Sequence, residues 1–181
     1  ALTAFLMLSI IYSLGHQRHW LKARSLCSQL TTSVSRLEAT GPIYLANLPA
    51  EWDEVPLFIS DWALRGALRF QGQNREIIAI ANVIKAQRAE RIATYPVDER
   101  RFEMHLTDPD EFFRLEQLEI LSGAQPLEIG YSYSKAGIVI RVTGLNDQRQ
   151  ANALEIDMGS EDRLARVYLW DGEQLVPLVG S

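Results

Sequence analysis

Acidic and indole side chains are concentrated in one short stretch, and they are the residues best suited to bind a ligand. Glu51, Trp52 and Asp53 follow a proline-bounded apolar run, and Asp61 and Trp62 come shortly afterwards. Carboxylates accept hydrogen bonds from hydroxyl groups and apolar ring faces stack on CH groups, so this combination suits a glycan. Paired carboxylates also suit glycoside chemistry, which requires a defined separation between them. The competing interpretation, which we favour, is an acidic solvated loop whose two tryptophans pack in the core.

The other polar candidates carry no catalytic signature. His105 alternates with Met104 and Leu106, so we predict a surface histidine of a strand rather than a catalytic base. Ser60 lacks the G-x-S-x-G context of a nucleophile, and the glycines form no nucleotide-binding loop. One cysteine and three scattered histidines do not make a zinc site. The sequence therefore predicts no catalytic residue, no metal and no cofactor.

The start of the chain is uncharged over residues 1–15 and has no initial methionine. A spanning helix needs about 20 apolar residues, so we predict that residues 1–16 are the end of a transmembrane helix through which the chain contacts the membrane. Aromatic and basic residues collect at membrane borders. The border here comprises Tyr12, His16, Arg18, His19 and Trp20. A buried helix of a soluble domain is the alternative.

Apolar residues then recur at heptad spacing, which predicts an amphipathic connecting helix over residues 17–40. This heptad seam consists of Trp20, Ala23, Cys27, Leu30, Val34 and Leu37. Gly41-Pro42 is a typical helix end. We expect the seam to pack on the chain's own domain rather than to form a coiled-coil dimer. Cys27 is then a small buried apolar residue rather than a nucleophile.

The rest of the chain is predicted to be α+β, with a small α/β unit over residues 41–84 and an antiparallel β-rich unit over residues 85–181. One merged domain is equally consistent with the sequence. In the first unit a strand over residues 42–49 precedes a loop, and Ser60 caps a helix that Gly72 closes. A second strand follows over residues 76–84.

The β-rich unit is expected to be an antiparallel sheet or sandwich of about six strands. Alternating apolar residues over 101–106 and the run 138–143 are the clearest strands. A short helix is predicted over residues 109–116 and a strand over residues 163–170. Asp171-Gly172 predicts a turn into the last strand.

Charge excludes one class of partner. The chain holds 18 basic and 23 acidic side chains, of which residues 1–24 hold three basic and no acidic ones. Residues 25–181 therefore carry a net charge of −8. Nucleic-acid binding needs a basic footprint, so no nucleic acid is expected as a partner. The charge also disfavours anionic lipid beyond the basic cluster near the membrane.

Several short motifs together resemble a known kind of domain. They are a Trp20-x-x-Ala23 helix, the strand 43–49 ending in Asn47-Leu48-Pro49, the helix 63–70 and a strand with Leu169-Trp170-Asp171-Gly172. This arrangement resembles the C-terminal tail of bacterial multi-pass membrane glycosyltransferases of the mannosyltransferase type, which use lipid-linked sugar donors. Ala50 stands where the family pattern has aspartate, and residues 55–60 replace its glycine-aromatic segment.

The resemblance implies a non-catalytic soluble C-terminal domain of an integral membrane glycosyltransferase-like protein. The family's catalytic acidic residues lie in loops between early membrane helices, so none is carried over to this chain. The implied partners are the remainder of the parent protein and a glycan or lipid-linked sugar. The implied location is the bacterial inner membrane with the tail outside the cytoplasm, whereas the basic flank from Arg18 to Arg24 favours a cytoplasmic tail.

Two further functions remain open from the sequence. One is a single-span envelope scaffold or assembly protein with a helical stalk and an α+β head. The other is a stand-alone sugar-binding module built on Trp52 and Trp62.

Overall fold

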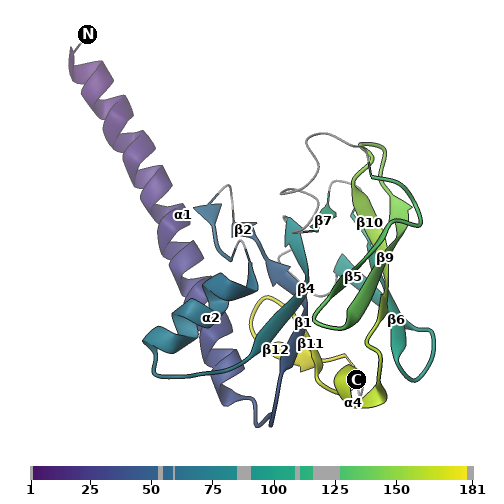
Figure 1. Ribbon diagram of the computed structural model, residues 1–181. Coiled ribbons are helices and arrows are strands. Elements are labelled where there is room, and N and C mark those ends of the chain that lie inside the picture. The colour runs from purple at the N-terminus through teal and green to yellow at the C-terminus, as the bar shows by residue number, and fades with distance from the viewer. Residues whose placement is uncertain are drawn as a thin grey trace.

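The chain folds into two five-stranded β-sheets packed face to face, with two helices on the outer face of one sheet (Figure 1). This computed structural model describes residues 2–52, 55–58, 60–84, 91–108, 111–115 and 127–178. The predicted α+β class is confirmed. The layers are helices, a mixed sheet and an antiparallel sheet.

The mixed sheet is built around one fully buried central strand. Its order is β12 (Leu175–Pro177), β11 (Val167–Trp170), β1 (Ile43–Pro49), β4 (Ile77–Ile84) and β7 (Phe112–Arg114). β1 pairs in parallel with both β4 and β11, whereas β7 and β12 are antiparallel to their neighbours. Every residue of β1 is buried, as expected of a parallel strand covered on both faces.

Two helices, α1 (Leu2–Arg36) and α2 (Asp61–Phe70), cover the same face of this sheet. Leu30, Val34, Leu64 and Leu68 are at most 1 % exposed and pack with Trp170 and with the strand residues on this face. The prediction that the heptad seam packs on its own domain is therefore confirmed from Ala23 onward. It is wrong for Trp20, which is 57 % exposed because α1 has left the sheet at that point.

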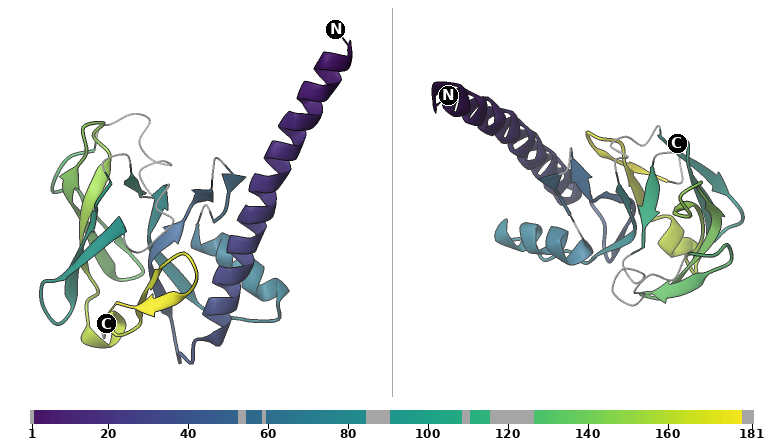
Figure 2. Two further views of the ribbon diagram at one scale, coloured as in Figure 1. Left: turned by 180° about the vertical axis from the view of Figure 1, so that it is seen from behind. Right: turned by 90° about the horizontal axis from the view of Figure 1, so that it is seen from above.

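The N-terminal half of α1 extends away from the head in all views, where the head means residues 37–178 (Figures 1 and 2). In the part of the chain that is described, no helix is long and apolar enough to cross a membrane. Helical structure over the predicted membrane segment is thus observed, and its insertion in a membrane stays a prediction.

The antiparallel sheet has the order β5 (Ile92–Pro96), β6 (Arg101–Leu106), β10 (Ala151–Asp157), β9 (Ile138–Leu145) and β8 (Ser132–Lys135). Its inner face, with Met104, Ile140 and Leu154 fully buried, packs against Tyr44 and Ile80 of the mixed sheet. Strands from both sides of residue 84 therefore share one core.

Three local predictions were wrong. Residues 112–114 form β7 rather than a helix, because Phe113 packs between the sheets and pairs with Val83. The predicted strand over residues 163–170 starts only at Val167, since α4 (Glu161–Leu164) precedes it. The predicted loop after β1 contains a hairpin of β2 (Glu51–Trp52) and β3 (Val55–Pro56).

Candidate functional site

We expect a site at the end of the mixed sheet where β1 and β4 finish. Ligands of α/β sheets bind outside the carboxyl ends of parallel strands. The chain leaves β1 here, forms the β2–β3 hairpin and enters α2, so Glu51, Asp61 and Trp62 of the residues predicted to bind glycan lie around this edge.

Two buried asparagines hold this edge together from within. Asn47 donates a hydrogen bond to the carbonyl of Trp170 at 2.9 Å and accepts one from its N–H at 2.7 Å. Asn82, opposite Leu48 in the register, donates to the carbonyl of Phe58 at 2.9 Å. The Asn47-Leu48-Pro49 motif thus contributes a structural side chain, and Asn47 is only 2 % exposed.

The start of α2 places a buried hydroxyl beside a buried carboxylate. Ser60 occupies the N-cap position with an extended backbone, as predicted, but its side chain makes no capping hydrogen bond. Its Oγ is buried and has no hydrogen-bond partner among the described residues. Asp61 follows in the first turn, where a negative charge is favourable to the helix dipole.

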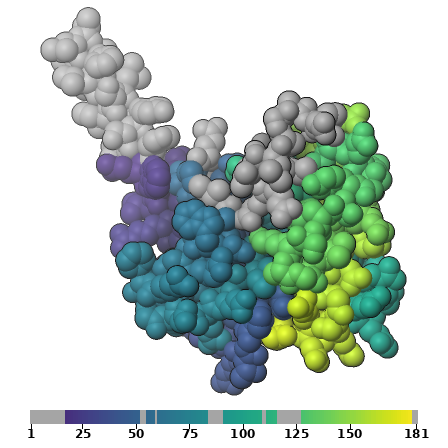
Figure 3. Space-filling model, in the orientation of Figure 1, coloured from purple at the N-terminus to yellow at the C-terminus, as the bar shows by residue number. Residues whose placement is uncertain are grey.

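The carboxylate of Asp61 joins two layers of the molecule. One oxygen lies 3.3 Å from the Arg65 guanidinium and the other 3.3 Å from Nζ of Lys135. Lys135 belongs to β8, the edge strand of the antiparallel sheet, and Figure 3 shows this region (green) against α2 (blue-teal). The ion pair therefore lies beside the β4 edge of the mixed sheet. Only residues 82–84 of that edge are paired with β7.

The five residues predicted to contact glycan have different environments. Asp61 is 8 % exposed and ion-paired, so the favoured picture of a solvated acidic loop is wrong for it. Trp62 is 68 % exposed on α2, so it does not pack in the core as that picture required. Glu51 is half-buried in β2. Asp53 and the side chain of Trp52 lie outside the described residues.

Lys135 and Arg65 at this edge were not among the predicted site residues. Arg65 stands one helical turn after Asp61, a spacing that indicates an i,i+4 pair. No local signal could have found Lys135, because its contact with Asp61 depends on how the two sheets stack.

A second buried carboxylate lies beside β7. Glu111 is 1 % exposed, and its Oε1 accepts a 2.7 Å charged hydrogen bond from Arg91, which also lies 3.4 Å from Asp108. Its Oε2 is buried without a hydrogen-bond partner in the described chain. Burial raises the pKa of Glu111 above its ordinary value, and Arg91 opposes that rise. Buried ion-pair clusters shift pKa values as active sites do, so the shift alone does not indicate catalysis.

His105 lies on the outer face of the antiparallel sheet. Its Nε2 is 2.9 Å from Glu103, and Tyr95 packs edge-on against its ring at 5.2 Å. The prediction of a surface strand histidine is confirmed.

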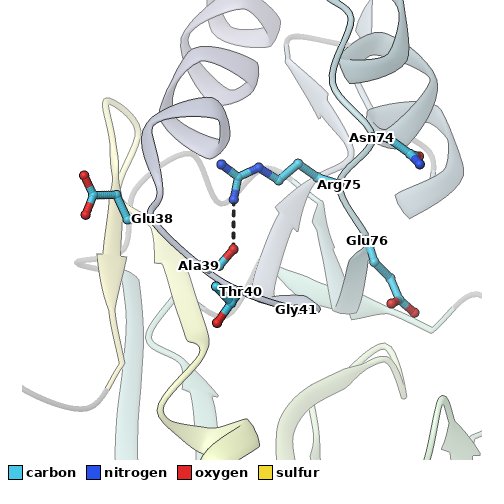
Figure 4. A pocket seen from close by; sticks show the side chains of 7 residues that line it. All are labelled: Glu38, Ala39, Thr40, Gly41, Asn74, Arg75 and Glu76. Atoms are coloured by element: carbon cyan, nitrogen blue, oxygen red, sulfur yellow. Dashed lines mark hydrogen bonds between the residues drawn. The ribbon is translucent and has the colours of Figure 1, made fainter.

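A cavity of about 560 Å³ lies at the opposite end of the mixed sheet, between the two helix-to-strand connections (Figure 4). The side chain of Arg75 reaches across it to the carbonyl of Ala39 at 3.3 Å. Glu38 and Glu76 point away from that contact on opposite sides. The Arg75 guanidinium in this cavity is thus already hydrogen-bonded, and the other polar side chains that line the cavity do not converge on one point.

The described residues contain no group of three or more histidine, cysteine, aspartate or glutamate side chains that could hold a metal. No protein-family model matches the chain, and no curated protein and no solved structure matches it.

Proposed function

We propose that this chain is a non-catalytic extramembrane domain of a membrane glycosyltransferase-like protein, and that the edge formed by the ends of β1 and β4 contacts glycan. One observation carries the proposal. α1 is a single helix whose second half is part of the core and whose uncharged residues 2–15 run out from the head.

The dimensions of α1 fit a helix that enters a bilayer. Residues 2–15 give about 21 Å of helix at 1.5 Å per residue. The hydrocarbon core is about 30 Å thick, so residues 2–15 alone account for about two thirds of that thickness. The helix continues into the docked residues Ala23–Arg36 without a break, so one element joins the proposed membrane segment to the head.

The direction of the elements supports glycan contact at the strand ends. α1 runs down to Arg36 and the chain turns back into β1, so β1 points toward the uncharged half of α1. α1 also contacts the β2–β3 hairpin. A sugar carried on a membrane lipid would therefore meet Glu51 and Trp62 rather than the cavity at Arg75.

The scaffold alternative has less support. Association through the heptad seam would need Leu30 and Val34, which are at most 1 % exposed inside the head. A dimer through these residues would expose the helix-facing core.

Detection of the native protein tests the proposal. An antiserum against the head should find a band in carbonate-washed membranes, at an apparent mass several times the 20.5 kDa of this chain. A membrane band close to 20.5 kDa would favour the single-span scaffold. A band only in the soluble fraction would overturn the proposal.

Glycan contact is tested separately by titration of the chain with oligosaccharides and lipid-linked sugar analogues. The expected result is binding that Trp62→Ala abolishes and that Phe70→Ala, which removes an even more exposed aromatic side chain at the far end of α2, leaves intact. Binding weaker than about 1 mM to every sugar would remove glycan from the proposal.

A further inference from the structure

Two large apolar side chains stand exposed next to each other on α1. Trp20 is 57 % and Leu21 65 % exposed. They lie between the uncharged stretch and Ala23, the first residue that is buried against the head. Exposed apolar side chains mark a membrane or partner site when they form a contiguous patch, and these two adjoin the uncharged stretch of the same helix.

Along α1 itself, the charged side chains near these residues are all basic. Arg18 and Arg24 are exposed on the same two turns, and α1 contains no acidic residue. Residues 25–181, by contrast, carry a net charge of −8. The positive segment is therefore confined to the place where α1 leaves an acidic head.

Indole rings favour the level of lipid headgroups, where one part of the ring is wet and the other is in an apolar phase. Arginine beside an anionic membrane surface adds attraction, whereas the acidic head is repelled by the same surface. The preference of the indole ring and the charge interactions both favour a position in which residues 17–24 lie among the lipid headgroups and the head lies outside the membrane.

We propose that residues 17–24 form a collar that binds the headgroups of anionic lipids, with Trp20 and Leu21 as apolar anchors and Arg18 and Arg24 as cations. The inference rests on the proposed function, because it needs the uncharged half of α1 to enter the bilayer. It adds the class of lipid and the depth to which the helix enters the bilayer. In this position the end of the head that carries the β2–β3 hairpin faces the lipid surface.

Flotation of the intact chain with vesicles tests the collar. The probes are vesicles of phosphatidylcholine alone and vesicles with a third of phosphatidylglycerol. Each cation near such a surface is worth about fivefold in partitioning, so anionic lipid should raise binding by 10-fold or more at low salt. The Arg18→Gln/Arg24→Gln double variant should lose most of that gain, and Trp20→Ala/Leu21→Ala should weaken binding to both vesicles.

Matched controls lie elsewhere on the two helices. Arg36→Gln/Arg69→Gln removes two exposed cations away from the collar, and Phe70→Ala removes a side chain that is 96 % exposed. Both should bind like the parent chain, and circular dichroism should show that every variant is folded.

The outcomes separate the two proposals. Binding to neutral vesicles without any gain from anionic lipid overturns the collar alone. Retention of the gain in Arg18→Gln/Arg24→Gln overturns it as well. Absence of binding to both vesicles overturns membrane insertion, and the collar falls with it.

Discussion

The side-chain amide of Asn47 takes the place of a rung in the ladder between β1 and β11, since it both donates to and accepts from the backbone of Trp170. The backbone pairs of these strands are Tyr44 with Val167 and Leu45 with Tyr168. Asn47 extends the pairing to Trp170, whose indole is buried against the helices. One side chain thus aligns the C-terminal strands with the central strand.

Replacement of Asn47 by leucine should destabilise the fold strongly. The change leaves the N–H and the carbonyl of Trp170 buried without these partners, and each such group costs about 1–3 kcal/mol. We expect a loss of about 2–5 kcal/mol in the free energy of unfolding, measured by urea denaturation. Asn74→Ala, an exposed asparagine, should change it by less than about 0.5 kcal/mol. Equal effects of the two variants would contradict a structural role for Asn47.

The contact between Asp61 and Lys135 should be energetically coupled. The two side chains are only 12 % and 19 % exposed, so solvent screens the pair less than a surface pair. A double-mutant cycle with Asp61→Asn and Lys135→Gln should give about 1–3 kcal/mol of coupling. The surface pair Arg141–Glu155, whose arginine is 52 % exposed, should give less than about 1 kcal/mol in the same measurement. A coupling no larger than that of the surface pair would show that Asp61–Lys135 does not hold the layers together.

Periodicity alone predicted the elements whose burial is local. The heptad spacing of Ala23, Leu30 and Val34 identified a docked helix, and the alternation of Phe102 and Met104 identified β6 with its buried face. These patterns are visible because each element buries one regular stripe or face.

The features set by the stacking of layers could not be predicted. β7 is only three residues long, and Phe113 becomes a strand residue because the end of β4 offers it a partner. The contact between Lys135 and Asp61 likewise depends on how the two sheets stack. Trp62 is exposed because Leu64 and Leu68 form the face of α2 that packs on the sheet. The sequence of a ten-residue helix does not show which face this will be.

Two glycines should respond to alanine in opposite directions. Gly66 lies inside α2 with open space around its missing Cβ, so Gly66→Ala should stabilise the fold by about 0.5–1 kcal/mol. Gly41 has a φ of +114°, and a Cβ there would press on the Arg166 guanidinium, which lies over the Tyr44 ring. Gly41→Ala should therefore cost about 1–3 kcal/mol. Thermal unfolding of both variants checks the signs, and a stabilising Gly41→Ala would refute the strain argument.

The buried carboxyl of Glu111 should make stability depend on pH in a definite direction. Its pKa is raised in the folded chain chiefly by burial, so the folded state holds this proton more tightly than the unfolded state. Stability then falls as pH rises from the ordinary glutamate value of 4.5 through the raised folded value, and the loss is complete above it.

Glu111→Gln removes that titration while retaining an oxygen that can accept from Arg91. The parent chain should therefore lose stability relative to the variant as pH rises above about 4.5. Urea denaturation of both proteins across this range measures the difference. A parent chain that gains stability over the variant as pH rises would show that the attraction of Arg91 outweighs the burial of Glu111.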